Sequence, residues 1–301
     1  HDVVEDTPVT LEQVRTKYGD EVAHLVDGLT KVTSELMGRE DLKKETYKKT
    51  LLVAINDIRV LCLKFWDRID NLQTIDALPL QKQKLIAEET RSVYVPLARH
   101  LGMGYVATEL ESLSHSLLYP KRAKRYQQVV SQLQENTSAY LRQIRGKIHI
   151  ACEKQKLSVV IKERWRPFTI PAAQEMGRGF VALFTLEVHV DRMMDAYLFL
   201  GLLHSLFPPI PGKLRDHLNQ ISQHGYLAIK TTVQAEEQRL RVEITTRKLA
   251  RFNQAGVLAP GFRFRHDNFR ALMKSLMDGE SAFDTESLKL ASATIQVYTP
   301  Q

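Results

Sequence analysis

The spacing of apolar positions divides this chain into a helical first part and a mixed second part. From His1 to about Leu118, apolar residues recur at the three- and four-residue intervals of amphipathic helices. Beyond Leu157 the pattern changes to short runs rich in β-branched and aromatic residues, which are typical of strands and alternate with a helix. The sequence therefore predicts an α+β multidomain protein, in which an all-α domain is followed by an α/β domain.

Local signals predict where the helices of the first part begin and end. The opening segment, residues 1–6, should end at Thr7, because the residue before a proline is steered away from helical angles. A capping box formed by Thr10 and Gln13 predicts the start of the next helix. Further helices are predicted from Asp20 onward, over residues 47–66 and over residues 79–99, the last kinked at Pro96.

A connector is predicted between the two parts. After a break at Tyr119 and Pro120, a basic, glutamine-rich helical stretch covers residues 122–155. Strand-length runs follow at 157–161, 180–190 and 240–245, with helices at 193–206 and 267–277 and a last strand at 293–299. We expect a first domain over residues 1–118, a connector over 119–156, a second domain over 157–290 and the start of a further domain at 291–301.

Composition narrows the class of protein without identifying an activity. Hydrophobic residues make up 44% of the chain and charged residues 26%, as in ordinary globular proteins. The net charge of +7 is compatible with an anionic ligand or with weak nucleic-acid contact. Cys62 and Cys152 lie in apolar helical contexts, which indicates buried thiols in a reducing compartment. With no apolar run long enough for a bilayer and no secretory signal, we expect a cytoplasmic protein without membrane contact.

Acidic side chains gather around a histidine at the start of the chain. Residues three and four apart share one face of a helix, so Asp2 lies over Glu5 and Asp6. His1 likewise lies over Glu5. Carboxylates crowded on one stripe repel one another unless a positive charge lies among them, and a divalent metal ion commonly supplies it. The stripe is also compatible with a solvated helix start, where acids complement the helix dipole.

A further candidate carboxylate is Asp67, which follows the apolar stretch of residues 51–63 and so lies toward the end of a mostly buried helix. Buried carboxylates are rarely tolerated without a cation or strong hydrogen-bond donors. The cation could be a metal ion shared with the opening segment, or the neighbouring Arg68 in a plain salt bridge. The spacing of the residues leaves both alternatives open.

Several motifs occur in a characteristic order along the chain. They are HDVVEDT at residues 1–7, VDGLTK at 26–31, DIRV at 57–60, KFWDRIDNLQT at 64–74 and YVPLARHLG at 94–102. This set resembles the hydrolase half of the long RelA/SpoT homologues, enzymes that make and destroy guanosine 3′,5′-bis(diphosphate). The resemblance continues, with weaker motifs, through PGK at 211–213, HGY at 224–226 and EITT at 243–246, and so covers nearly the whole chain.

The resemblance implies a metal-dependent hydrolytic site in the first domain. His1, Asp2 and Asp67 match ligands of Mn²⁺, and a further ligand histidine is expected from residues upstream of His1. Glu5 and Asp6 match residues that orient and deprotonate the attacking water. The implied substrate is guanosine tetra- or pentaphosphate, and a divalent ion would offset the negative charge of its 3′-diphosphate.

Further residues match family positions that contact the nucleotide, namely Lys31, Asn71 and Thr74. Capping of a helix C-terminus explains Asn71 and Thr74 as well, and a surface lysine explains Lys31. The sequence departs from the family at Asp70, where a histidine is usual, and at Gln73, where an arginine is usual. Because an arginine can stack on a base, these changes affect the expected substrate affinity more than the chemistry.

The second half resembles the family's synthetase but differs at residues that carry its chemistry. Pyrophosphate transfer needs carboxylates that hold magnesium and activate a ribose hydroxyl. Ala182 and Arg241 stand where the family has its two essential acids, and Glu187 stands where it has an arginine. Tyr226, which stacks on guanine in active members, is retained, although a packed aromatic would look the same. The resemblance therefore implies a nucleotidyltransferase-like pseudo-synthetase domain.

Together these features predict a SpoT-like hydrolase of guanosine tetra- and pentaphosphate that has lost synthesis. One alternative is another phosphohydrolase of the HD superfamily, acting on cyclic nucleotides or deoxynucleotides. The other is a non-catalytic regulator that binds the alarmone or the ribosome without turnover. The family also implies ribosomal or regulatory protein partners, and a ubiquitin-like regulatory domain that begins at residues 291–301.

Overall fold

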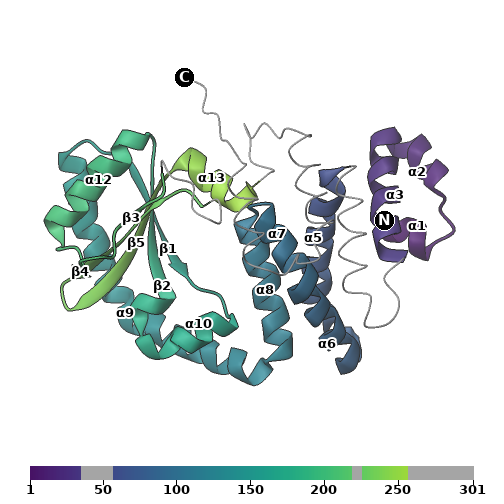
Figure 1. The fold of residues 1–301 in the computed structure, drawn as a ribbon, viewed down its shortest axis with the longest axis horizontal. Helices are drawn as coiled ribbons and strands as arrows, with labels where there is room; N and C mark the ends of the chain where they lie inside the picture. The colour runs from purple at the N-terminus through teal and green to yellow at the C-terminus, as the bar shows by residue number, and fades with distance from the viewer. Residues whose placement is uncertain (35–56, 219–225, 257–301) are drawn as a thin grey trace. The chain divides into compact units, whose positions relative to one another are not determined.

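The computed structural model describes residues 1–34, 57–218 and 226–256 (Figure 1). The chain divides into two compact units, of which the first contains His1–Ala98 and the second is Arg99–Gly261. The predicted elements at 267–277 and 293–299, and the expected start of a further domain at 291–301, lie outside the described residues. Within the described parts, no helix combines the length and the apolar character that crossing a membrane requires.

The first unit is entirely helical in its described residues, as the apolar spacing predicts. Helix α1 ends where expected, because Thr7 adopts an extended conformation before the proline. The predicted capping box is present, since the Thr10 hydroxyl accepts from the Gln13 amide and the Gln13 side chain accepts from the Thr10 amide. The helices are α1 (Asp2–Asp6), α2 (Leu11–Tyr18), α3 (Asp20–Ser34), α5 (Ile58–Gln73), η1 (Ile75–Ala77), α6 (Leu80–Glu89), η2 (Thr90–Tyr94) and α7 (Val95–His100).

Helix α5 differs from the helix predicted over residues 47–66. It begins at Ile58, because Asp57 has an extended backbone and its carboxylate caps the helix by accepting from the Arg59 amide at 2.9 Å. It also continues to Gln73, seven residues beyond the predicted end at Trp66. Residues 47–56 lie outside the described part of the chain. Asp67 is therefore in the interior of a helix rather than toward its end.

A π-helical turn precedes the proline that was expected to kink the helix over residues 79–99. In η2 (Thr90–Tyr94) the Val95 amide donates to the Thr90 carbonyl, five residues back. A proline ring clashes with the carbonyl four residues before it in a regular helix. The wider turn changes the backbone spacing just before Pro96, so the helical path continues into α7.

In its described residues, the second unit is built on a mixed sheet of five strands in the order β1-β2-β5-β4-β3. Only β2 and β5 run parallel; the other neighbouring pairs are antiparallel. The strands are β1 (Val159–Trp165), β2 (Phe184–Val190), β3 (Arg215–Asp216), β4 (Ile229–Ala235) and β5 (Gln238–Thr246). The helices are α8 (Gly104–Leu118), α9 (Pro120–Lys154), α10 (Ile170–Glu175), η3 (Met176–Arg178), α11 (Phe180–Leu183), α12 (Met193–Leu206) and α13 (Arg247–Ala255).

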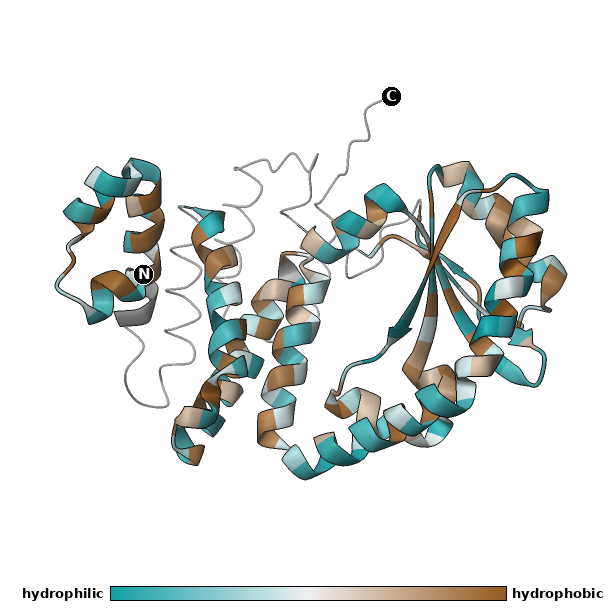
Figure 2. Ribbon diagram, turned by 180° about the vertical axis from the view of Figure 1, so that it is seen from behind, coloured by the Kyte–Doolittle hydropathy of each residue, from teal (hydrophilic) through white to brown (hydrophobic). Residues whose placement is uncertain are grey.

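Helices α9 and α12 cover one face of this sheet. Ile144 of α9 and Phe199 of α12 join the inward-facing strand residues in one buried cluster, which includes Val188 of β2 and Ile244 of β5. Because side chains alternate along a strand, the residues between them face the opposite side of the sheet. In Figure 2, apolar and polar residues are mixed along the helices, and apolar residues are prominent in the central strands.

Several predictions for the second part are confirmed and one is wrong. Helix α12 has the predicted bounds, and the long helix α9 agrees with the helical stretch predicted over residues 122–155. The strand predicted over residues 180–190 instead starts at Phe184, because residues Phe180–Leu183 form the helical turn α11. Strand β4 lacked a sequence prediction. The α+β class is nevertheless the one expected.

The first domain was predicted to reach residue 118, whereas the two units meet at residues 98 and 99. Helix α8 packs within the second unit against α13. At Gly104 an added Cβ atom would lie 3.0 Å from the carbonyl oxygen of Asn253. The two helices approach this closely at Gly104 because glycine has no side chain.

Candidate metal centre

Helices α1 and α5 bring an imidazole and two carboxylates together in the first unit. His1 Nε2 lies 3.2 Å from Asp2 Oδ1 and 3.6 Å from Asp67 Oδ1. Helix α3 contacts both α1 and α5. The His1 side chain is only 10% exposed, whereas the Asp2 side chain is 74% exposed. The opening segment and the Asp67 helix therefore meet, although some sixty residues separate them in the sequence.

The arrangement suits a divalent cation. One ligand atom from each of His1, Asp2 and Glu5 can be chosen so that all lie within 4.8 Å of one another. Oxygen and imidazole ligands of this kind match manganese, zinc or iron, and their spacing is short enough for a shared ion. Asp67 adds a carboxylate oxygen beside the same imidazole. The donor set therefore fits a divalent metal ion, with Asp67 beside His1 but outside the group of three.

Asp67 is held on both of its carboxylate oxygens. Its side chain is 17% exposed, and Oδ2 lies 2.7 Å from Lys64 Nζ, one helical turn earlier. Oδ1, which faces His1, accepts a hydrogen bond of 3.2 Å from Asn71 Nδ2. The cation beside Asp67 is thus Lys64. Sequence reasoning did not single out this lysine, although its position on a largely apolar helix, three residues before an acid, was the available signal.

Arg68, the alternative partner considered for Asp67, makes its contacts elsewhere. Its guanidinium forms an ion pair of 3.0 Å with Glu89 and donates a 3.0 Å hydrogen bond to the Tyr94 hydroxyl. It also lies over the Tyr94 ring, 4.4 Å from the centroid. Burial raises the pKa of Tyr94, and the guanidinium partly opposes that rise. Arg68 therefore connects α5 to α6 and η2 and does not serve as the salt-bridge partner of Asp67.

The remaining predicted residues of this site occupy different surroundings. Glu5 contributes to the cluster of ligand atoms, whereas Asp6 is exposed on α1 outside that cluster. Asn71 contacts Asp67, as described above. Thr74 ends α5, and its hydroxyl donates to the Asp70 carbonyl at 3.0 Å, which is the capping role that was the alternative to nucleotide binding. The side chain of Lys31 lies outside the described residues.

The residues singled out in the second unit do not form a comparable acidic site. Ala182 lies in the turn α11, not on the strand, and its carbonyl accepts from Arg166. Arg241 is half-buried on β5, opposite Thr232 of β4. Among the described residues, the only group of three or more potential ligands close enough to share an ion is the one in the first unit.

Two glutamates lie side by side on the parallel strands β2 and β5. Glu187 is paired in register with Glu243, and Arg164 of β1 forms ion pairs with both. The Tyr226 hydroxyl donates to Glu243 at 2.9 Å, and Lys230 lies 3.7 Å from the same carboxylate. Burial raises the pKa of Tyr226. The acids are thus neutralised by cations of the protein itself.

Lys230 also lies over the ring of Tyr226, with Nζ 4.5 Å from the ring centroid. A cation in this position interacts favourably with the face of the aromatic ring. The retained tyrosine is therefore fixed at its hydroxyl by Glu243 and contacted on its ring by Lys230. Both contacts are made within the protein, so stacking of Tyr226 on guanine stays a prediction.

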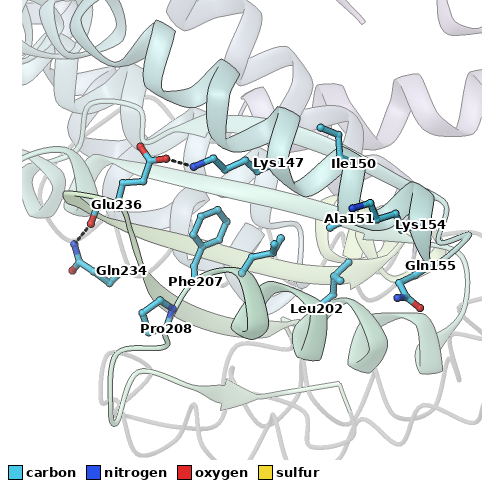
Figure 3. Close-up of a pocket in the computed structure, with 11 residues that line it drawn as sticks. Lys147, Ile150, Ala151, Lys154, Gln155, Leu202, Phe207, Pro208, Gln234 and Glu236 are labelled. Carbon is cyan, nitrogen blue, oxygen red and sulfur yellow. Dashed lines mark hydrogen bonds and ion pairs between the residues drawn. The ribbon is translucent and has the colours of Figure 1, made fainter.

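A separate hollow of about 650 Å³ lies in the second unit between α9, α12 and the end of β4 (Figure 3). Its lining includes Leu202, Phe207 and Pro208, and Lys147 forms an ion pair with Glu236 at its edge. Figure 3 also shows the Gln234 side chain hydrogen-bonded to the Glu236 backbone. The lining is mainly apolar and its acid is already paired, so the hollow does not resemble the metal centre.

Comparisons with known proteins match both parts of the chain. Residues 1–104 match the family model described as HD domain. A probable GTP pyrophosphokinase of Mycobacterium leprae is 35% identical over all of this chain and 42% of its own length. A guanosine-3′,5′-bis(diphosphate) 3′-pyrophosphohydrolase of Aquifex aeolicus is 32% identical over 80% of this chain and 35% of its own length.

A protein of the same printed name from Haemophilus influenzae is 29% identical over 77% of this chain. The alignment covers 35% of that relative's own length. The chain therefore spans well under half the length of these curated relatives. Their printed names describe both the making and the hydrolysis of guanosine polyphosphates.

Proposed function

Because this chain belongs to the RelA/SpoT family, we propose that its first unit is a metal-dependent hydrolase of guanosine tetra- and pentaphosphate. Water would attack the phosphorus bonded to the ribose 3′ oxygen. The bond between this phosphorus and the ribose 3′ oxygen would break, and the ribose oxygen would take a proton. The products would be pyrophosphate and GDP or GTP. The observation that carries this proposal is the approach of His1 on α1 to Asp67 on α5.

We propose that His1, Asp2 and Asp67 hold a divalent ion, with Mn²⁺ as the expected metal. A bound ion of this kind activates water near neutral pH and offsets charge on the diphosphate. Glu5 lies one helical turn from Asp2, and its carboxylate is close enough to His1 and Asp2 to orient the attacking water and accept its proton. Asp6, on the same short helix, would share this task.

The nucleotide-contacting residues form a finer part of the proposal. Asn71 reaches the edge of the centre through its hydrogen bond to Asp67, and this contact supports a role beside the substrate. The Thr74 hydroxyl donates to a carbonyl of its own helix, which is a structural role. If this hydroxyl donated to a nucleotide, it would have to give up that bond. Lys31 stays a prediction from the family resemblance.

The direct test is release of pyrophosphate from guanosine tetraphosphate by the full-length protein in the presence of Mn²⁺. We expect turnover that a chelator abolishes and that falls by orders of magnitude in Glu5→Gln and Asp6→Asn. A panel of cyclic nucleotides and deoxynucleotides separates this activity from that of other HD phosphohydrolases. Absence of pyrophosphate release by the metal-loaded wild-type protein would refute the proposal.

We propose that the second unit does not synthesise guanosine polyphosphates. The support is Ala182 and Arg241 at the expected acid positions, and the pairing of Glu187 and Glu243 with Arg164. Incubation with ATP, GTP and Mg²⁺ should yield no AMP and no guanosine polyphosphate. Synthesis by the wild-type protein would overturn this part without affecting the hydrolase proposal.

The alternative of a non-catalytic regulator predicts a different pattern of binding. In that case a guanosine nucleotide should bind through the second unit, near Tyr226, with no turnover and no metal in the first unit. Nucleotide binding measured with and without Mn²⁺, together with metal analysis, distinguishes the two. Ribosomal or regulatory protein partners are proposals that rest on the family alone.

A further inference from the structure

We propose that Lys64 is a positioning residue that orients Asp67 toward the metal ion. The inference rests on the proposed function, because it assigns a task within the same centre. It is carried by a contact on the helix itself, in which Lys64 Nζ lies 2.7 Å from Asp67 Oδ2. Lys64 would not touch the ion or the substrate and would act only through this carboxylate.

Because Lys64 is buried, its ion pair with Asp67 calls for a functional reason. Its side chain is 5% exposed, on a helix whose neighbouring Leu61 and Phe65 are buried. Lysine is almost never fully buried without a partner, because removing its charge from water costs free energy. A well-packed apolar residue at the same place would often be at least as stable. We therefore look for its role in the geometry of Asp67.

That geometry distinguishes the two carboxylate oxygens of Asp67. Oδ2 points to the buried ammonium, while Oδ1 faces His1 at 3.6 Å and accepts from Asn71. A carboxylate fixed through one oxygen presents the other in a defined direction. Ligand carboxylates in metal sites are commonly oriented by outer partners, and here that partner is an ion-paired ammonium group. Lys64 thus selects Oδ1 as the oxygen available to the ion.

The charge of Lys64 also matters before an ion binds. Asp2, Glu5 and Asp67 bring carboxylates near one another around His1. Like charges repel, so without an ammonium group beside it Asp67 would tend to turn away from the other acids. An opposite effect exists as well, since a lysine repels a divalent ion. The two effects predict changes of opposite sign in metal affinity when Lys64 is replaced.

The test is the affinity for Mn²⁺, measured on the full-length protein without substrate by following free Mn²⁺ with electron paramagnetic resonance. Loss of a residue that orients a metal ligand typically weakens binding about 10–100-fold. We expect this loss in Lys64→Met and a partial recovery in Lys64→Arg, which keeps a positive charge that can pair with Oδ2. Lys147→Met is a control for the same substitution at an ion-paired but exposed lysine of the second unit.

Thermal unfolding without metal checks that each variant is folded. A merely structural lysine would change the unfolding temperature and leave the Mn²⁺ affinity of the folded protein unaltered. If Lys64→Met does not fold, Lys64→Gln takes its place in the experiment. Glutamine is uncharged but keeps most of the side-chain length, and the same loss of Mn²⁺ affinity is expected. Mn²⁺ affinity in the folded variant equal to or tighter than that of the wild type would overturn the inference.

The outcome can be separated from that of the proposed function. Asp67→Asn should remove Mn²⁺ binding if the metal centre exists. If Asp67→Asn loses the ion and Lys64→Met does not, the role of Lys64 is wrong and the hydrolase proposal is unaffected. If the wild type binds Mn²⁺ without releasing pyrophosphate, the hydrolase proposal fails and the role of Lys64 is still decided by the affinities. A wild type that binds no Mn²⁺ refutes both.

Discussion

At the scale of single residues, the first unit contains two adjacent side chains on α5 with separate tasks. Asp67 faces the candidate metal centre, and Arg68 faces the buried side of the helix. Arg68 meets Glu89 and Tyr94 there, so it holds α5 against the segment formed by α6 and η2. A buried guanidinium requires such partners, because its charge cannot be left without them.

Replacement of Glu89 by alanine should therefore destabilise the protein. The variant leaves the Arg68 guanidinium buried without its carboxylate, and breaking a buried pair from one side costs about 3 kcal/mol or more. The control is Glu12→Ala, whose ion pair with Arg15 is exposed and should contribute less than about 1 kcal/mol. Urea denaturation measures both losses. Equal losses would show that the Arg68–Glu89 pair stabilises the fold no more than an exposed ion pair does.

A second prediction concerns pH and the histidines of the second unit. Burial lowers the pKa of His204 and of His189 relative to their usual values. The unfolded chain therefore binds these protons more readily, and stability should fall as the pH decreases through about 6.5 and below. The midpoint of thermal unfolding at pH 7.5 and 5.5 measures the effect.

His204→Gln serves as the comparison for that experiment. Glutamine can keep a hydrogen bond to the Thr231 hydroxyl, which lies 3.0 Å from His204 Nε2, but it does not titrate. The variant should lose less stability than the wild type between the two pH values. An unchanged pH dependence would mean that His204 does not contribute to it.

At the scale of the element, α5 owes its start to one carboxylate. Asp57 caps the helix, and the pKa of its carboxyl is lowered chiefly by the hydrogen bond from the Arg59 side chain. The same helix carries Lys64, Asp67 and Asn71 on successive turns, so its start and direction determine how these side chains meet α1. Asp57 is not itself a metal ligand, but it caps the helix that presents Asp67.

Asp57→Ala should destabilise the first unit by about 1 kcal/mol, the usual loss for an N-cap. Asp57→Asn retains a capping oxygen and should recover most of this stability at neutral pH. Because the pKa of Asp57 is lowered in the folded state, its contribution is present above the usual pKa of an aspartate and is lost as the pH falls. Chemical denaturation at neutral pH and near pH 3 tests both statements.

At the scale of the whole molecule, the described residues form two compact units, and the proposed chemistry belongs to the first. In the second unit, Arg164 forms ion pairs with both Glu187 and Glu243, and Lys230 is a second cation beside Glu243. The units thus differ in how their carboxylates are balanced. In the first, Asp2 and Glu5 gather around His1; in the second, Glu187 and Glu243 are paired with cations.

This difference predicts how a metal ion affects unfolding. A ligand that binds only the folded protein stabilises it by about 2.7 kcal/mol at one hundred times its dissociation constant. Calorimetry with saturating Mn²⁺ should therefore raise the unfolding temperature of the first unit, and a chelator should reverse the change. Asp67→Asn should abolish the increase. A shift that persists in Asp67→Asn would place the bound Mn²⁺ elsewhere in the molecule.

Much of the helical first unit could be predicted because its signals are local. The end of α1 at Thr7 and the capping box of α2 depend on residues within a few positions of one another. The bounds of α12 also agree with the prediction. By contrast, β4 has an alternating pattern that becomes a strand through its pairing with β5 and was not predicted.

What the amino-acid sequence determined by itself was the helical character of the first unit, the α+β class and the residues from which a metal site could be made. Short-range backbone preferences and side-chain chemistry are sufficient for those conclusions. Only the tertiary structure decided that Lys64, not Arg68, neutralises Asp67, and that Phe180–Leu183 turns before β2 begins. The Lys64–Asp67 pair spans only one helical turn, but Arg68 is paired with Glu89 and Tyr94, which are distant in the sequence. Phe180 likewise packs against Tyr140 of α9. Local preferences do not specify such long-range contacts.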